Sequence, residues 1–73
     1  MLINMKEMLE QADKNGFAVP AFNIGSEAIL KGVVESANEK DAPVILAIHP
    51  TELEFLGDSF ISTCIQEAQK SKV

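Results

Sequence analysis

The chain has 73 residues, a formal net charge of −5 and a hydrophobic content of 47%, which is the composition of a globular protein and not of a disordered one. For its mass of 7.9 kDa, size scaling gives roughly 4,400 Å² of folded surface against about 11,500 Å² unfolded, so only about 60% can be buried in one small domain. The acidic balance and the lack of a Lys/Arg cluster argue against nucleic acid or an anionic membrane as a partner.

Three further features of the sequence argue against a membrane segment, a signal peptide, and a disulfide or structural zinc site. The longest apolar stretch, residues 43–48, is far shorter than the ~20 residues that span a bilayer, and residues 1–16 lack the continuous apolar run of a signal peptide. We therefore expect a cytoplasmic protein with no membrane segment. Cys64 has no second cysteine to pair with, and one cysteine with one histidine does not make a structural zinc site.

The first predicted element is a helix over residues 5–14. Asn4 followed three residues later by Glu7 resembles a capping box, and apolar residues recur at helical spacing behind it. Gly16 has the chemistry of a helix end.

A strand and a second helix follow. Residues 17–24 are apolar on both alternating faces, which predicts a strand covered on two sides. Pro20 suits an edge, a strand start or a bulge, because proline has no N–H for the ladder. Ser26 then caps a helix predicted over residues 27–40, which carries the clearest amphipathic stripe of the chain.

The carboxyl-terminal part repeats the pattern. Residues 44–48 form a continuous β-branched and aliphatic run, which predicts a second buried strand. Residues 51–57 read as a loop with one helical turn at most. A last helix runs from about Phe60 to about Lys70, with Cys64 on its apolar stripe as a structural thiol.

Helix, strand, helix, strand and helix joined by short connections indicate βαβ units with a parallel sheet. Two strands and three helices are too few for a closed barrel, which takes about 250 residues. The fold class we predict is therefore α/β, with residues 1–73 as one partial domain: the first two strands and flanking helices, or the amino-terminal quarter, of a (β/α)8 TIM barrel.

Three segments carry a resemblance. "FAVPAFNI" at 17–24, "VESA" at 34–37 and "APVIL" at 42–46 resemble the opening of the class II, metal-dependent ketose-bisphosphate aldolases, the family of fructose- and tagatose-bisphosphate aldolases. Each segment alone is weak, but "AVPAFN" with "APVI" about twenty residues later is fairly specific, and the resemblance covers essentially the whole chain.

The resemblance implies a zinc-dependent barrel enzyme of carbohydrate metabolism. Such an enzyme reversibly cleaves a ketose 1,6-bisphosphate, fructose or tagatose, into dihydroxyacetone phosphate and glyceraldehyde 3-phosphate, and is usually a homo-oligomer. In the family the acid/base Asp and the first zinc-binding His follow the third strand. We therefore expect the zinc ligands downstream of residue 73, no catalytic residue within this chain, and a phosphorylated sugar as the partner.

Asn23 is the first residue to which the resemblance gives a role. It holds the place of a family Asn at the carboxyl end of the first strand, which hydrogen-bonds substrate. An amide offers a donor and an acceptor without charge, and the carboxyl ends of barrel strands are where catalytic groups gather. The alternative is an Asn that only caps the following helix or bonds to its own loop.

His49 is the second candidate substrate-binding residue. It ends the second predicted strand, where many family members have a Ser or Thr that helps to hold a substrate phosphate, so the sequence departs from the family here. An imidazole can donate to phosphate, but a strand-end His bonded to a loop carbonyl is the alternative.

Two functions from different classes stay open. One is the aldolase reading, with this chain bearing part of the substrate pocket. The other is a non-catalytic βα fragment that acts only as an association or interaction module.

Overall fold

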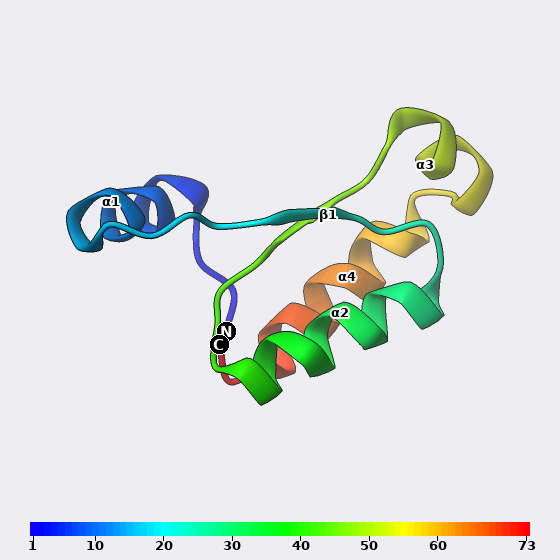
Figure 1. Ribbon diagram of the computed structural model, residues 1–73. Helices are drawn as coiled ribbons and strands as arrows, with labels where there is room; N and C mark the ends of the chain where they lie inside the picture. The colour runs from blue at the N-terminus through cyan, green and yellow to red at the C-terminus, as the bar shows by residue number, and fades with distance from the viewer.

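The computed structural model describes residues 1–73 and contains four helices and two short strands (Figure 1). The elements are, in chain order, α1 (Met5–Asn15), β1 (Ala21–Asn23), α2 (Glu27–Lys40), β2 (Ile45–Ala47), α3 (Pro50–Leu56) and α4 (Ser59–Lys70).

Helix α1 begins and ends as its sequence predicts. The Asn4 side chain accepts a hydrogen bond of 2.8 Å from the backbone N–H of Glu7. At the other end Gly16 adopts a left-handed conformation with φ 70°, and its N–H donates to the carbonyl of Ala12. Glycine suits this position because it has no Cβ to strain. The helix of residues 5–14 is confirmed, with one further residue, Asn15.

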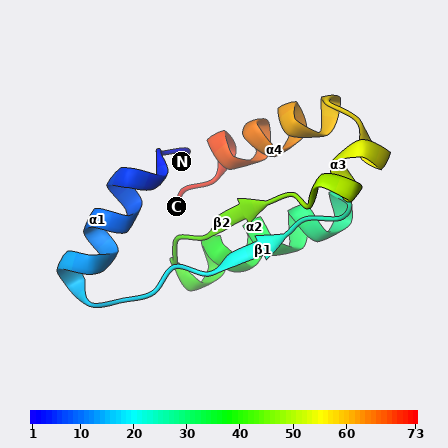
Figure 2. The ribbon, with the colours of Figure 1, turned by 90° about the horizontal axis from the view of Figure 1, so that it is seen from above.

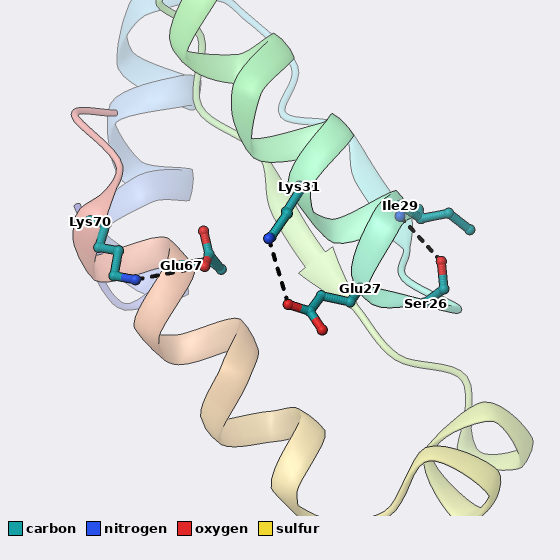
Figure 3. Close-up of polar contacts among 6 residues, drawn as sticks. All are labelled: Ser26, Glu27, Ile29, Lys31, Glu67 and Lys70. Atoms are coloured by element: carbon teal, nitrogen blue, oxygen red, sulfur yellow. Dashed lines mark hydrogen bonds and ion pairs between the residues drawn. The ribbon is translucent and has the colours of Figure 1, made fainter.

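Helix α2 is also confirmed over residues 27–40, and its cap is local. The Ser26 hydroxyl accepts a hydrogen bond of 3.2 Å from the N–H of Ile29, which satisfies one of the free amides of the first turn (Figure 3). Asp41 ends the helix with φ 53°.

The two strands pair in parallel. Ala21 lies opposite Ile45 and Asn23 opposite Ala47. The pairing extends to the carbonyl of Pro20, which accepts a hydrogen bond of 2.9 Å from the N–H of Ile45. Pro20 thus joins the ladder only through its acceptor, and the strand proper starts after it.

Both strands are shorter than predicted. The sequence indicates strands over residues 17–24 and 44–48, whereas only three residues of each have strand geometry. Each strand has a single neighbour here, so the flanking apolar residues have no second ladder to hold them extended. The apolar pattern indicates which residues tend to be buried. The length of the hydrogen-bonded ladder also depends on neighbouring strands other than these two.

Helices cover one face of the sheet. In the view from above, β1 and β2 lie over α2, with α4 alongside (Figure 2). The core between these layers is small, and Leu46, Ile48, Val33 and Leu56 pack against it as partly buried residues; its five buried members are Ile24, Leu30, Val34, Phe60 and Cys64. The predicted last helix is confirmed as α4, with Phe60 and Cys64 buried.

The opposite face of the sheet has no helix on it. All three residues of β1 are exposed, and those of β2 are only half-buried. The expectation that both strands are covered on two sides is therefore wrong for this chain. The reason is the number of elements: α1 lies off the amino ends of the strands and covers neither face (Figures 1 and 2).

Residues 51–57 differ most from the prediction. At the carboxyl ends of the strands the chain forms the seven-residue helix α3 from Pro50 to Leu56, where the sequence suggested a loop with one helical turn at most (Figure 1). Proline at the first helical position and Glu52 in the first turn both favour a helix start, and this signal was present in the sequence.

The molecule is less compact than a chain of this size can be. Its surface is 5,201 Å², compared with roughly 4,400 Å² from scaling, and its dimensions are 37 × 22 × 15 Å. The two termini meet, since the Met1 amine donates to the carbonyl of Ala68 at 2.7 Å. None of the four helices has the length and apolarity needed to cross a membrane. The chain is an α/β unit with a two-stranded parallel sheet.

Candidate functional site

The carboxyl ends of the two strands form one edge of the sheet. We call residues 23–26 after β1 and residues 48–52 after β2 the carboxyl edge. The N–H of Ile24 donates to the carbonyl of Ala47 over 2.8 Å, so the two segments leave the sheet side by side. This edge is where open parallel sheets and barrels place their binding groups.

Side-chain alternation separates the residues of this edge. Ile24 belongs to the core, and Ile48 packs against it, so both point towards α2 and α4. Successive strand residues point to opposite faces. Asn23, the last residue of β1, comes before Ile24 and therefore lies on the other face. His49 lies beyond the end of β2, and its extended backbone (φ −66°, ψ 138°) continues the alternation to the same face. We call this the open face; it consists of Ala21, Asn23, Ile45, Ala47 and His49.

Asn23 is exposed and its side chain makes no hydrogen bond within the chain. The cap of α2 is supplied by Ser26, so Asn23 is not used for that purpose. Its amide keeps both donor and acceptor free, and can present them to a ligand on the open face.

His49 has a structural partner that the sequence did not indicate. It is the N-cap of α3, and its Nδ1 accepts a hydrogen bond of 3.2 Å from the N–H of Thr51. The alternative of a bond to a loop carbonyl is not what is found, because the ring accepts from an amide. Nε2 makes no bond within the chain, and the residue is exposed.

Glu52 is the residue of this edge that sequence reasoning missed. Its carboxylate lies against Gly25, where an added Cβ would stand 3.5 Å from Oε2. Glu52 makes no ion pair. Its place at the third position of a helix opened by proline was a usable signal, had α3 been expected.

The carboxyl edge contains no cation. The six basic residues all lie outside residues 23–26 and 48–52; they are Lys6, Lys14, Lys31, Lys40, Lys70 and Lys72. Two of them are in ion pairs within single helices, Lys31 with Glu27 at 3.7 Å, where both side chains are exposed, and Lys70 with Glu67 at 3.8 Å, where the lysine is exposed and the glutamate half-buried (Figure 3). Such pairs contribute little to stability. A phosphate at this edge would find no counter-charge from this chain.

The residues also give no metal centre. No three His, Cys, Asp or Glu side chains come close enough to hold a metal ion. The residues present therefore do not fit zinc on their own. Cys64 is buried in the core, and burial raises the pKa of its thiol, which keeps it protonated and unreactive.

Two hollows exist, and both are mainly apolar. One, of about 540 Å³, is lined by the amino-terminal segment, β2 and α4, with residues such as Met1, Ile45 and Ile65. The other, of about 950 Å³, lies between β1 and α2 and includes Phe22 and Ile29. Neither is lined by Asn23 or His49, so these two residues lie on an open surface in this chain.

Comparison with known proteins gives one family. The model of the family described as fructose-bisphosphate aldolase class-II matches residues 3–73. A fructose-bisphosphate aldolase of Stutzerimonas stutzeri is 33% identical over 67 residues, which are 92% of this chain and 19% of the relative. One of Staphylococcus aureus is 43% identical over 47 residues, 64% of this chain and 16% of the relative.

The plasmid fructose-bisphosphate aldolase of Cupriavidus necator is 29% identical over 70 residues, 96% of this chain. The chain spans about a fifth of the length of that relative, 20%. No solved structure gives a significant match.

Proposed function

The chain belongs to the class II fructose-bisphosphate aldolase family, and on that premise we propose that it forms the first two strands, with their helices, of a (β/α)8 barrel in a longer enzyme. The observation that carries the proposal is the family match across residues 3–73. The one-sided sheet supports it, because a face left open by this chain is what the inside of a barrel would be. The two apolar hollows are surfaces that further strands and helices would cover.

The reaction we propose is the reversible cleavage of a ketose 1,6-bisphosphate into dihydroxyacetone phosphate and glyceraldehyde 3-phosphate. Fructose and tagatose 1,6-bisphosphate are both candidate substrates. The two sugars differ only in the configuration at one carbon, and both give the same two products. Zinc is the expected cofactor by family membership. This chain offers no metal centre, so the proposal assigns the zinc ligands and the acid/base carboxylate to residues after 73.

Asn23 has the role of a substrate-binding residue in this proposal. This role is supported by the position of Asn23 at the carboxyl end of β1, on the open face. Its side-chain amide makes no hydrogen bond to another residue of the chain. An amide N–H there can donate to a substrate oxygen on which charge develops as the carbon–carbon bond breaks. His49, on the same face two residues beyond Ala47, is the second substrate-binding residue.

The other partners follow from the same premise. The enzyme binds a phosphorylated sugar, acts in the cytoplasm in glycolysis or a related route, and assembles as a homo-oligomer. The acidic charge of −5 supports the exclusion of nucleic acid and anionic membranes as partners.

A kinetic assay of the complete polypeptide that contains this chain tests the proposal. Release of triose phosphate is followed with fructose 1,6-bisphosphate and, separately, with tagatose 1,6-bisphosphate. We expect chelator-sensitive cleavage of at least one of them, and the ratio of the two kcat/KM values decides the substrate. Absence of cleavage with both, in a folded protein loaded with zinc, would refute the enzyme.

The second candidate function is an association module without chemistry. It is favoured by the exposed surface of 5,201 Å² and by large apolar side chains such as Phe55, which is 88% exposed. The coding sequence after Val73 separates the two candidates. A stop codon there would favour the module, whereas continuation into a strand that ends in His and Asp would favour the enzyme.

A further inference from the structure

A polar contact ties the carboxyl-terminal segment to α2. The side-chain carbonyl of Asn38 accepts a hydrogen bond of 2.9 Å from the Ser71 hydroxyl and one of 3.0 Å from the N–H of Lys72. The N–H of Val73 donates to the Ser71 hydroxyl over 3.3 Å. Asn38 and Ser71 are both half-buried and are 33 residues apart in the sequence. We call Asn38 and residues 71–73 the clasp.

The clasp is a tertiary contact, because neither helix needs it for its own end. Helix α2 ends at Asp41, whose N–H donates to the backbone carbonyls of Ala37 and Asn38. Helix α4 ends at Ser71, whose N–H donates to carbonyls in the last turn of that helix. The Asn38 side chain is therefore available to fix the direction in which the chain leaves α4.

That direction leads to the amino end of β2. Ser71 and Val73 line the hollow of about 540 Å³ together with Pro43 and Val44, which lead into β2. In both ribbon views the carboxyl end of the chain lies beside this segment (Figures 1 and 2). A strand parallel to β2 must begin at this end of the sheet, and a helix that returns the chain there is the usual crossover between parallel strands.

The outer edge of β2, on the side away from β1, has no partner strand. Towards β1, the N–H of Ile45 donates to the Pro20 carbonyl over 2.9 Å. On the same side, the carbonyl of Ala47 accepts from the N–H of Ile24 over 2.8 Å. Leu46 lies between these two residues of β2, so its N–H and C=O point to the outer edge. The sheet has only two strands, and these two groups of Leu46 are left without a ladder to join.

We propose that Asn38 is a positioning residue: its side-chain carbonyl holds residues 71–73 at the amino end of β2, so that the residues directly after Val73 add to the outer edge of β2 in one register. The inference rests on the proposed function, in which the polypeptide continues past Val73. Register matters because a slip of one residue turns every side chain of a strand to the other face. The groups that the added strand presents beside the open face therefore depend on Asn38.

Amide hydrogen exchange of the complete polypeptide, followed by NMR, tests the strand pairing. The N–H of Leu46 should be protected by the added strand, and the N–H of Ile45, which is bonded to Pro20, is the internal reference. Asn38→Ala removes the acceptor of two hydrogen bonds and should raise the exchange rate of Leu46 about tenfold relative to that of Ile45. A Leu46 amide that exchanges in the wild type as fast as a freely exposed one would overturn the proposal.

Three further variants identify the chemistry of the clasp. Both bonds use the Asn38 oxygen only as an acceptor, so Asn38→Asp keeps them and should restore the wild-type ratio of the two exchange rates. Ser71→Ala removes one donor and should raise the ratio less than Asn38→Ala. Asn15→Ala is the matched control, because the Asn15 amide bonds only to Gln11 within α1, and its ratio should equal that of the wild type. A ratio in Asn38→Asp as high as in Asn38→Ala would overturn the proposal.

The outcomes separate this inference from the proposed function. A wild type without aldol cleavage refutes the enzyme, whereas the exchange rates still decide the inference. An active wild type whose exchange ratio is unchanged in Asn38→Ala refutes the inference and leaves the enzyme standing. If Asn38→Ala does not fold, Ser71→Ala decides: a raised ratio supports the clasp, and an unchanged ratio contradicts it.

Discussion

Replacement of Asn23 by alanine should separate substrate binding from stability. Asn23 is exposed and its side chain has no hydrogen bond within the chain, so truncation leaves no buried group unpaired. The free energy of unfolding should therefore change by at most about 0.5 kcal/mol, as for an ordinary surface position. If the amide donates to an oxygen on which charge develops, its loss costs about 3 kcal/mol of transition-state stabilisation, on the order of a hundredfold in turnover.

Asn4 provides the matched control. It is the same residue type, and its side chain accepts a hydrogen bond of 2.8 Å from Glu7 as the N-cap of α1. Asn4→Ala should cost about 1 kcal/mol of stability and leave turnover at the wild-type value. Both variants are made in the complete polypeptide, and each is measured for kcat, KM and denaturant midpoint with the better of the two ketose bisphosphates.

The two variants are expected to give opposite patterns. A stable Asn23→Ala protein with greatly reduced turnover, beside a less stable Asn4→Ala protein with normal turnover, is the predicted result. Asn23→Ala with wild-type turnover would refute the role of this residue, whatever its effect on stability, and Asn23 would then be only the last residue of β1.

Three further predictions concern the chain as it folds. Leu30 is fully buried, whereas its neighbour Ile29 is 48% exposed. Leu30→Ala should therefore lower the free energy of unfolding by about 3 kcal/mol, and Ile29→Ala should lower it far less, as measured by denaturation. Equal losses would contradict the core of Ile24, Leu30, Val34, Phe60 and Cys64. Burial raises the pKa of Cys64, so the folded state keeps the thiol proton more tightly than the unfolded state. The free energy of unfolding should not depend on this group well below the ordinary thiol pKa of 9.0, and should fall as the pH rises beyond it. Cys64→Ala should reduce that fall. Residues 1–73 alone should neither cleave a ketose bisphosphate nor retain zinc through dialysis. They should associate through their exposed apolar surface. A 73-residue chain that is active, retains zinc or stays strictly monomeric would contradict these expectations.

Local signals predicted α1, α2 and α4 well. Asn4 with Gly16, and Ser26 with the stripe through Leu30, place α1 and α2 to within a residue, because caps and helical periodicity are decided by neighbours in sequence. The parallel pairing was also predicted, from the order of elements, because short connections through a helix force strands to run in the same direction.

Strand length and burial could not be predicted in the same way. They depend on how many neighbouring strands and helices pack against each strand. An apolar run such as residues 44–48 does not indicate whether those neighbours belong to the same chain. The helix α3 was not predicted for another reason: a proline directly after an apolar run is typical of the end of a strand, but Pro50 is also at the preferred first position of a helix.

The candidate site was predicted only through resemblance to the family. Asn23 has no signal of its own in the sequence, since an Asn before a Gly-Ser turn is an ordinary turn residue. Its place on the open face comes from the register with Ala47 and from the inward direction of Ile24, which only the fold supplies. The ring orientation of His49 required the first turn of α3 to be present.

A crystal structure of the complete polypeptide with a bound ketose 1,6-bisphosphate would show whether β1 and β2 belong to a barrel that binds substrate. We expect the open face of β1 and β2 to line the inside of a barrel, with the Asn23 amide about 3 Å from a substrate oxygen. Substrate bound elsewhere, or Asn23 turned away from it with the face of Phe22 and Leu46 lining the pocket, would contradict the account.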